Sequence, residues 1–190
     1  MRLTERLTGA HGALLVVDVQ DKLLERIIDR DTVIANSVRL VKAAQQLHMP
    51  VWATEQYPKG LGPTVAELAR RLPQRPDKTA FSSCAVPSVV ETFRRAARPK
   101  VVLVGIEAHV CVLNTALDLL ALDFRVYLAA DAVGSRYPID RDFALRRLEQ
   151  AGAILTTAET CVFEWLGGAG HPRFKEVSTL VQGRMKAIQQ

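Results

Sequence analysis

The chain has 190 residues, of which 48% are hydrophobic and 24% charged, and its formal net charge is +5. These values are typical of a single globular α/β domain with a substantial core. No apolar run is long enough to span a membrane, the amino terminus has no apolar signal core, and the basic residues lack a nucleic-acid-binding signature. We therefore expect neither a membrane nor a nucleic acid as a partner.

Short apolar runs alternate with amphipathic stretches along the chain. The runs predict buried strands at 13–17, 51–54, 78–81, 101–104, 125–130 and 153–156. The stretches between them predict helices at 31–48, 64–72, 88–97, 113–120, 140–151, 159–166 and 172–182. This alternation predicts a doubly wound, Rossmann-like parallel sheet of about six strands with helices on both faces. We expect one domain over 1–190, with its core at about 11–182.

Several element ends carry their own signals. Asp31 and Asp140 are expected to cap the helices that follow them, and Gly152 is expected to end the second of these helices. Segment 55–63 is rich in turn residues and predicts a loop. This segment, with 132–139 and 165–172, would set the size of a substrate pocket.

Three residues of different chemistry are expected at comparable places in the sheet: Asp18 and Cys111 after strands, and Lys78 in a brief strand or strand end. Open α/β sheets bind ligands beyond the carboxyl ends of their strands, so these side chains could meet there. Cys111 also lies at the start of a helix, where backbone N–H groups and the helix dipole favour a thiolate. Asp18 could take the thiol proton and Lys78 could hold the thiolate. Taken singly, they also fit a strand-end cap, an exposed lysine and a packing thiol.

Three segments together resemble the isochorismatase-like cysteine hydrolase family. They are 17–20 (VDVQ), 77–82 (DKTAFS) and 105–112 (GIEAHVCV), in the family's order, and the resemblance covers roughly 11–182. The exact form of the third segment, with 55–62 (EQYPKGLG) and 163–167 (FEWLG), is similar to the isochorismatase domain-containing protein subgroup.

The resemblance implies a catalytic triad of Asp18, Lys78 and Cys111. Cys111 would attack a small amide-like carbonyl compound and form a thioester, with Asp18 as the general base and Lys78 supporting the ionised pair. It also implies a non-proline cis peptide bond at Ile106–Glu107. The backbone N–H groups of Glu107 and Cys111 would then form the oxyanion hole. The family further implies a homo-oligomer, dimeric at least, that acts on a small molecule.

Departures from the family narrow the chemistry. Nicotinamidases carry an Asp-x-His metal motif where this chain reads 54–57 (TEQY), and no histidine occurs between His48 and His109. We therefore expect no metal and no cofactor. True isochorismatases cleave a vinyl ether without depending on the cysteine, so Cys111 favours acyl chemistry. The alternatives are an ether hydrolase, a catalytically silent scaffold or binding protein, and a redox-responsive thiol protein.

The remaining candidates concern the pocket and the other thiols. Possible substrate-pocket residues are Gln20, Tyr57, Phe81, Tyr137 and Trp165, although aromatic side chains more often pack cores or interfaces. Gln20 and Glu107 could bind substrate or brace the loop. His109 is not expected to act directly, because the family assigns the base to Asp18. Cysteines at 84, 111 and 161 show neither disulfide nor metal-site spacing, which favours reduced thiols in a cytoplasmic protein.

Overall fold

The structure, a computed structural model, describes residues 6–188 of the chain, with side chains as far as residue 182. Its centre is a six-stranded parallel sheet in the order β3-β2-β1-β4-β5-β6. The strands are β1 Gly12–Val17, β2 Val51–Gln56, β3 Asp77–Lys78, β4 Lys100–Ile106, β5 Arg125–Gly134 and β6 Ile154–Thr156. This arrangement confirms the predicted doubly wound α/β fold.

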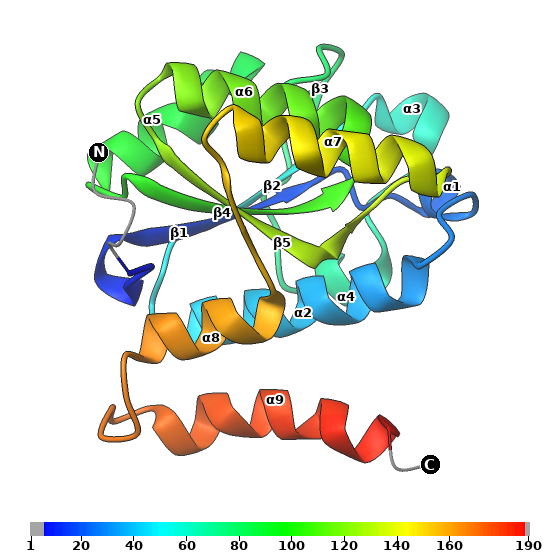
Figure 1. Ribbon diagram of the computed structural model, residues 1–190. Helices are drawn as coiled ribbons and strands as arrows, with labels where there is room; N and C mark the ends of the chain where they lie inside the picture. The colour runs from blue at the N-terminus through cyan, green and yellow to red at the C-terminus, as the bar shows by residue number, and fades with distance from the viewer. Residues whose placement is uncertain (1–5, 189–190) are drawn as a thin grey trace.

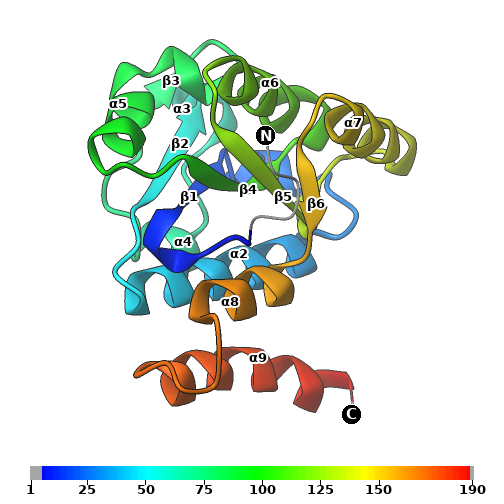
Figure 2. The same cartoon turned by 60° about the vertical axis from the view of Figure 1, so that its left-hand side comes forward.

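Helices cover both faces of the sheet (Figures 1 and 2). The helices are α1 Asp21–Leu24, α2 Arg30–Gln46, α3 Pro58–Leu61, α4 Ala66–Ala69, α5 Pro87–Arg95, α6 Leu113–Ala121, α7 Pro138–Gln150, α8 Ala158–Leu166 and α9 Phe174–Ile188. Helices α5, α6 and α7 lie on one face, α2 and α8 lie on the other, and α9 packs outside them. None of the helices in the described part of the chain is long and apolar enough to cross a membrane.

The central strands bury side chains on both faces, as their continuous apolar runs predict. Every residue of β1 and of β4 is buried. Leu14 and Val102 belong to the core beneath α2 and α8, whereas Leu15 and Leu103 belong to the core beneath α5, α6 and α7. The central strands are therefore packed between two apolar cores, which hold the carboxyl ends of these strands in fixed positions.

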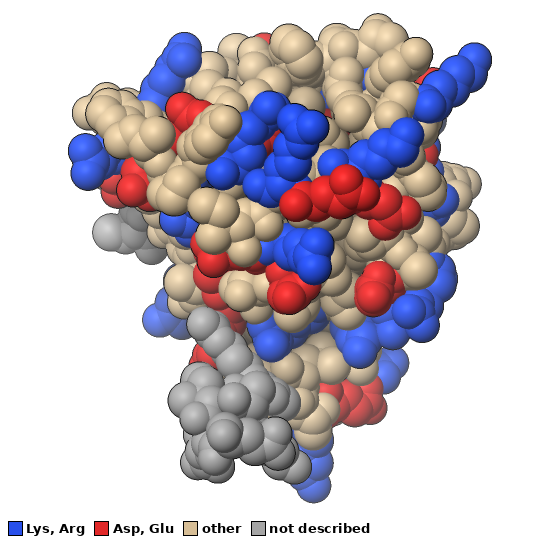
Figure 3. Space-filling view, turned by 90° about the vertical axis from the view of Figure 1, so that its right-hand side faces the viewer, with Lys and Arg blue, Asp and Glu red and all other residues tan. Residues whose placement is uncertain are grey.

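The carboxyl ends of β1 and β4 lie side by side where the strand order reverses. Val17 is paired with Gly105, which has a φ of 119°. A Cβ atom on Gly105 would lie 2.0 Å from the Val17 carbonyl oxygen, so only glycine allows this approach. The edge seen in Figure 3 is the one towards which these strands point. Ligands of doubly wound sheets bind at such a switch point.

Some element boundaries differ from the sequence predictions. Segment 55–63 is not a continuous loop: β2 runs to Gln56, Tyr57 has a left-handed φ of 37°, and α3 follows. Helices α2 and α7 begin before Asp31 and Asp140, so neither residue is the N-cap. In α7 the first residue is Pro138, whose fixed φ favours that position.

The predicted end of α7 is confirmed, whereas the predicted end of the strand at 125–130 is too early. Gly152 does follow the end of α7, with a φ of 103° and its N–H bonded to the Glu149 oxygen. Strand β5 continues past Asp131 to Gly134, with a register shift against β4. The Asp131 carboxylate accepts a 2.7 Å hydrogen bond from the Ala158 N–H. That contact agrees with the structural role expected for Asp131.

Candidate active site

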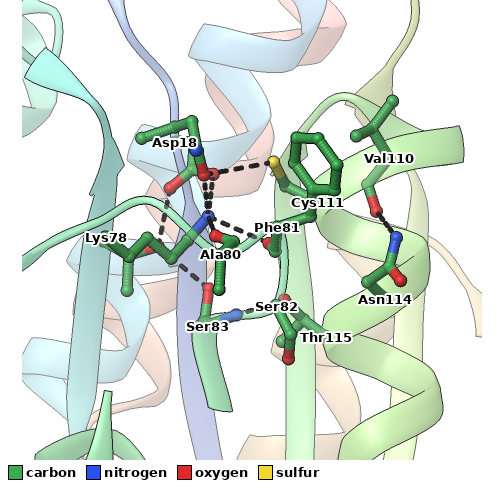
Figure 4. Close-up of polar contacts among 12 residues, drawn as sticks. Asp18, Lys78, Ala80, Phe81, Ser82, Ser83, Val110, Cys111, Asn114 and Thr115 are labelled. Carbon is green, nitrogen blue, oxygen red and sulfur yellow. Dashed lines mark hydrogen bonds and ion pairs between the residues drawn. The ribbon is translucent and has the colours of Figure 1, made fainter. Parts of the chain in front are cut away.

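Asp18, Lys78 and Cys111 lie together at the carboxyl edge of the sheet (Figure 4). Asp18 follows β1, Lys78 ends β3, and Cys111 lies in a π-helical turn, Ala108–Val112, that follows β4. Lys78 Nζ is 2.6 Å from Asp18 Oδ2, and the Cys111 thiol donates a 3.8 Å hydrogen bond to Gln56 Oε1, which also accepts from Lys78. All three side chains are buried. The fold thus joins three residues that are distant in sequence.

Two neighbouring hydroxyl groups orient Asp18. Thr54 Oγ1 donates a 2.7 Å hydrogen bond to Asp18 Oδ1, and the Asp18 N–H donates to the Thr54 carbonyl oxygen. Thr54 Oγ1 lies 2.9 Å from Ser83 Oγ, and the Ser83 N–H donates to Thr115 Oγ1 at 2.9 Å. This buried chain fixes the carboxylate from the side opposite Lys78, and the sequence reasoning missed it.

The Lys78 ammonium group is enclosed by acceptors. Besides Asp18, it donates to Gln56 Oε1 at 2.7 Å, to the Phe81 carbonyl oxygen at 2.9 Å and to the Ala80 carbonyl oxygen at 3.3 Å. A buried ammonium group is tolerated only when it is paired and hydrogen-bonded in this way. Lys78 is therefore held as a cation beside Asp18. Gln56, which also went unrecognised in the sequence, supplies one of its acceptors.

The Cys111 thiol is protonated at neutral pH. Burial and then the Asp18 carboxylate raise its pKa to about 12, and the nearby Lys78 ammonium lowers the pKa too little to compensate. The helix start and Lys78 therefore do not by themselves ionise the thiol, and the expected role of Lys78, to hold the thiolate that results when Asp18 takes the proton, stays a prediction. The physical reason is that Lys78 is bonded directly to Asp18, whose negative charge disfavours a second anion beside it.

Glu107 precedes the turn that carries Cys111, and the Ile106–Glu107 peptide bond is cis, as expected from the resemblance. Its carboxylate accepts hydrogen bonds from the Arg136 backbone N–H at 3.0 Å and from Arg136 Nη2 at 2.6 Å. Burial alone would raise the pKa of Glu107, but the hydrogen bonds and charge of Arg136 hold it below its usual value. Of the two alternatives left open for Glu107, this geometry agrees with bracing the loop.

The five pocket candidates do not form one cluster. Tyr57, Phe81 and Tyr137 are exposed, and Phe81 contributes its backbone oxygen to the surroundings of Lys78. Trp165 is buried in the core beneath α2 and α8, on the other face of the sheet from Cys111. The Gln20 side chain is fully buried and bonds to the backbone of Gln56 and to the Gly62 oxygen. Gln20 therefore braces the loop, and Trp165 packs the core.

The His109 ring contacts residues outside the group formed by Asp18, Lys78 and Cys111. Its Nδ1 lies 3.0 Å from Ser135 Oγ, and its Nε2 lies 3.8 Å from Asp140 Oδ2. These contacts connect the turn that carries Cys111 to the start of α7. They agree with the expectation that His109 does not act as the base.

Comparisons with known proteins decide the family. The chain matches the family model of the Isochorismatase domain over residues 12–160. The chain belongs to the isochorismatase family. Isochorismatase domain-containing protein 2 of Xenopus laevis is 41% identical over 182 residues, which cover 95% of this chain and 88% of that protein.

Solved structures agree with this family and with the fold. MAR1 ribonuclease from Caenorhabditis elegans is 46% identical, has a TM-score of 0.89 and is matched over 94% of this chain and 93% of its own. YcaC from Pseudomonas aeruginosa, solved with hexane-2,5-diol and covalent acrylamide, is 25% identical with a TM-score of 0.83, covering 96% and 98% of the two chains.

The carboxyl end of β2, which aligns with the metal motif of nicotinamidases, makes other contacts here. Glu55 accepts hydrogen bonds from Thr64 Oγ1 at 2.7 Å and from Arg75 Nε at 3.0 Å. Gln56 is bonded to Lys78. Among the described residues, no group of three or more His, Cys, Asp or Glu side chains is arranged to hold a metal ion. This segment therefore supports the fold and Lys78.

Proposed function

We propose that this isochorismatase-family protein is a cysteine hydrolase that cleaves a small amide-like C–N bond without a metal ion. The observation that carries the proposal is the shared carboxylate of Asp18. Its oxygens receive the Lys78 ammonium at 2.6 Å and the Thr54 hydroxyl at 2.7 Å, and its charge lies close enough to the Cys111 thiol to raise the pKa of that thiol. A carboxylate placed against a buried thiol can act as its general base.

The first half-reaction acylates the enzyme. As Cys111 Sγ attacks the amide carbonyl carbon, its proton moves to Asp18, because the thiol is not ionised beforehand. The carbonyl oxygen becomes an oxyanion, for which the backbone N–H groups of Glu107 and Cys111 serve as donors. Collapse of this intermediate breaks the C–N bond. Asp18 returns the proton to the leaving nitrogen, so that an amine or ammonia departs and a Cys111 thioester remains.

The second half-reaction regenerates the thiol. Asp18 takes a proton from water, and the resulting hydroxide equivalent attacks the thioester carbonyl carbon. The C–S bond then breaks, the carboxylic acid product leaves, and Asp18 returns its proton to Cys111. Lys78, 2.6 Å from Asp18 Oδ2, holds the carboxyl group in position while that group exchanges its proton.

A property of one relative supports a reactive nucleophile in this fold. YcaC from Pseudomonas aeruginosa was solved with covalent acrylamide, a small unsaturated amide. A covalent bond to acrylamide requires a nucleophile, and a cysteine thiolate is the most nucleophilic side chain that proteins offer. In this chain we assign that part to Cys111.

The test is turnover of a panel of small amides, followed as ammonia release. Wild type is expected to hydrolyse at least one amide, and Cys111→Ala is expected to lose that activity while retaining its circular dichroism spectrum. Cys84→Ala is the matched control, because Cys84 lies outside the triad and partial burial raises the pKa of its thiol to about 11. Equal turnover by the Cys111→Ala protein would refute the mechanism.

The same preparations should be tested against single-stranded RNA, because a 46% identical relative is described as a ribonuclease. We expect no RNA cleavage that depends on Cys111. Failure of folded wild type to hydrolyse any amide, with an unreactive Cys111, would favour the scaffold alternative.

A further inference from the structure

A cavity of about 500 Å³ lies at the switch point, beside the segment that carries Cys111. Lys22 of α1 and the two residues that follow this helix, Glu25 and Arg26, line the cavity together with Glu107 and Arg136. Leu23 and Leu61 complete the lining. The cavity therefore shares Glu107 with the proposed oxyanion hole, and its volume is in the range of small-molecule sites.

The charges of the lining are not balanced. Arg136 is paired with Glu107 through Nε and Nη2, and its Nη1 forms no hydrogen bond to any described residue. Lys22 Nζ donates to the Gly60 carbonyl oxygen at 3.0 Å, which leaves its charge uncompensated. Among the described residues, Arg26 has no ion pair, and Glu25 is the one remaining acid of the lining. Three cations thus face two carboxylates, one of which is already bound.

The pairing with Glu107 also fixes the orientation of the Arg136 guanidinium group. Two side-chain nitrogens and the backbone N–H of Arg136 bond to the Glu107 carboxylate, so the guanidinium plane is held in place. A guanidinium group that is oriented beforehand binds carboxylate or phosphoryl oxygens with less loss of side-chain entropy than a free one. Lys22 and Arg26 add charge to the same lining.

We propose that this cavity binds an anionic group of the substrate, a carboxylate or a phosphoryl group, so that the enzyme prefers amides that carry a negative charge. Arg136, Arg26 and Lys22 would be the recognition residues, and Leu23 and Leu61 would contact the carbon chain between the anion and the amide. That the bound anion is part of a substrate rests on the proposed function, whereas binding of an anion to the cavity can be measured without turnover.

The experiment measures binding to the full-length Cys111→Ala protein by calorimetry at low salt. The probes are succinamate and phosphonoacetamide, each an amide with an anionic end, and succinamide, which is neutral. We expect at least one anionic amide to bind about tenfold more tightly than succinamide, as a charge-assisted hydrogen bond would give. The tighter of the two anions identifies the group that the cavity selects.

Substitutions then locate the site. Arg26→Gln, made in the Cys111→Ala background, should weaken binding of the anionic amide about fivefold to tenfold and leave succinamide unchanged. Arg30→Gln is the matched control, because Arg30 is also exposed but does not line the cavity and lies 3.6 Å from Asp31. If Cys111→Ala does not fold, Cys111→Ser replaces it.

The outcomes separate this inference from the proposed function. Equal affinity for charged and neutral amides would overturn the anion site, and so would equal losses in Arg26→Gln and Arg30→Gln. Selective anion binding in a wild-type protein that hydrolyses none of the amides would support the anion site and refute only the proposed function. Turnover of neutral amides at the same kcat/KM as anionic ones would support the proposed function and refute the anion site.

Discussion

Replacing Asp18 by asparagine should make the Cys111 thiol more acidic while abolishing hydrolysis. In the wild-type protein, burial and the Asp18 carboxylate raise the pKa of Cys111 to about 12. An adjacent charge typically shifts a pKa by about 1–3 units, so its removal should lower the value to roughly 9–11.

The assay is peptide-resolved alkylation by iodoacetamide across a pH series, read by mass spectrometry. The midpoint for Cys111 should move to lower pH in Asp18→Asn, whereas the midpoint for Cys84 should stay unchanged. Turnover should fall by about 10²–10⁴, the usual contribution of a general base, although more thiolate is present. An unchanged or higher Cys111 midpoint would show that Asp18 does not control the thiol, and the reasoning would fail.

Three further predictions concern the supports of the site. Gly105→Ala should destabilise the protein by about 3 kcal/mol or more in urea unfolding, since its Cβ would meet a backbone oxygen at 2.0 Å, whereas Gly168→Ala, with nothing within 4 Å, should stay within about 0.5 kcal/mol. Equal effects would contradict this packing. Thr54→Val should lower kcat/KM about tenfold or more through loss of the 2.7 Å bond to the carboxylate, and Thr54→Ser should restore it; no rescue would contradict that role. The pKa of Glu107 lies below its usual value, so its pairing with Arg136 stabilises the fold above about pH 4.3 and is lost as the pH falls through the lowered pKa. Wild type should therefore lose more unfolding free energy between pH 6 and pH 3 than Glu107→Gln, and parallel losses would count against the pairing.

The fold was predictable because strands that are buried on both faces leave a strong signal. The β-branched run from Val101 to Val104 has no other common explanation, and its alternation with amphipathic stretches indicates a doubly wound sheet. Helix starts were less predictable. Asp140 was expected to cap α7, but the helix begins two residues earlier, at Pro138. Such choices depend on local backbone geometry that composition does not reveal.

The site was predictable only in part, because its supports come from strands that are far apart in sequence. Motif order identified Asp18, Lys78 and Cys111. It could not reveal that Thr54 and Gln56, on the neighbouring strand β2, would bond to Asp18 and Lys78. Their position at the end of a strand beside β1 was the available signal. The protonation state of the thiol was also hidden, because it depends on which group the lysine contacts.

The aromatic residues show a second limit of sequence reasoning. Trp165 and Phe81 both suit a pocket by residue type. Trp165 lies on α8 and is buried in the core between that helix and the sheet, whereas Phe81 is exposed. Residue type does not determine the face of the sheet on which a side chain lies. That information comes from the helix packing.

Covalent catalysis by Cys111 is tested most directly by the intact mass of the protein after rapid mixing with an amide that the enzyme hydrolyses, followed by acid quench. The account predicts a mass increase equal to the acyl group, located on the Cys111 peptide and removed by neutral hydroxylamine, and no such increase in Cys111→Ala. Continued release of ammonia by wild type without any acyl adduct on Cys111, under conditions in which the thioester should accumulate, would contradict covalent catalysis by this residue.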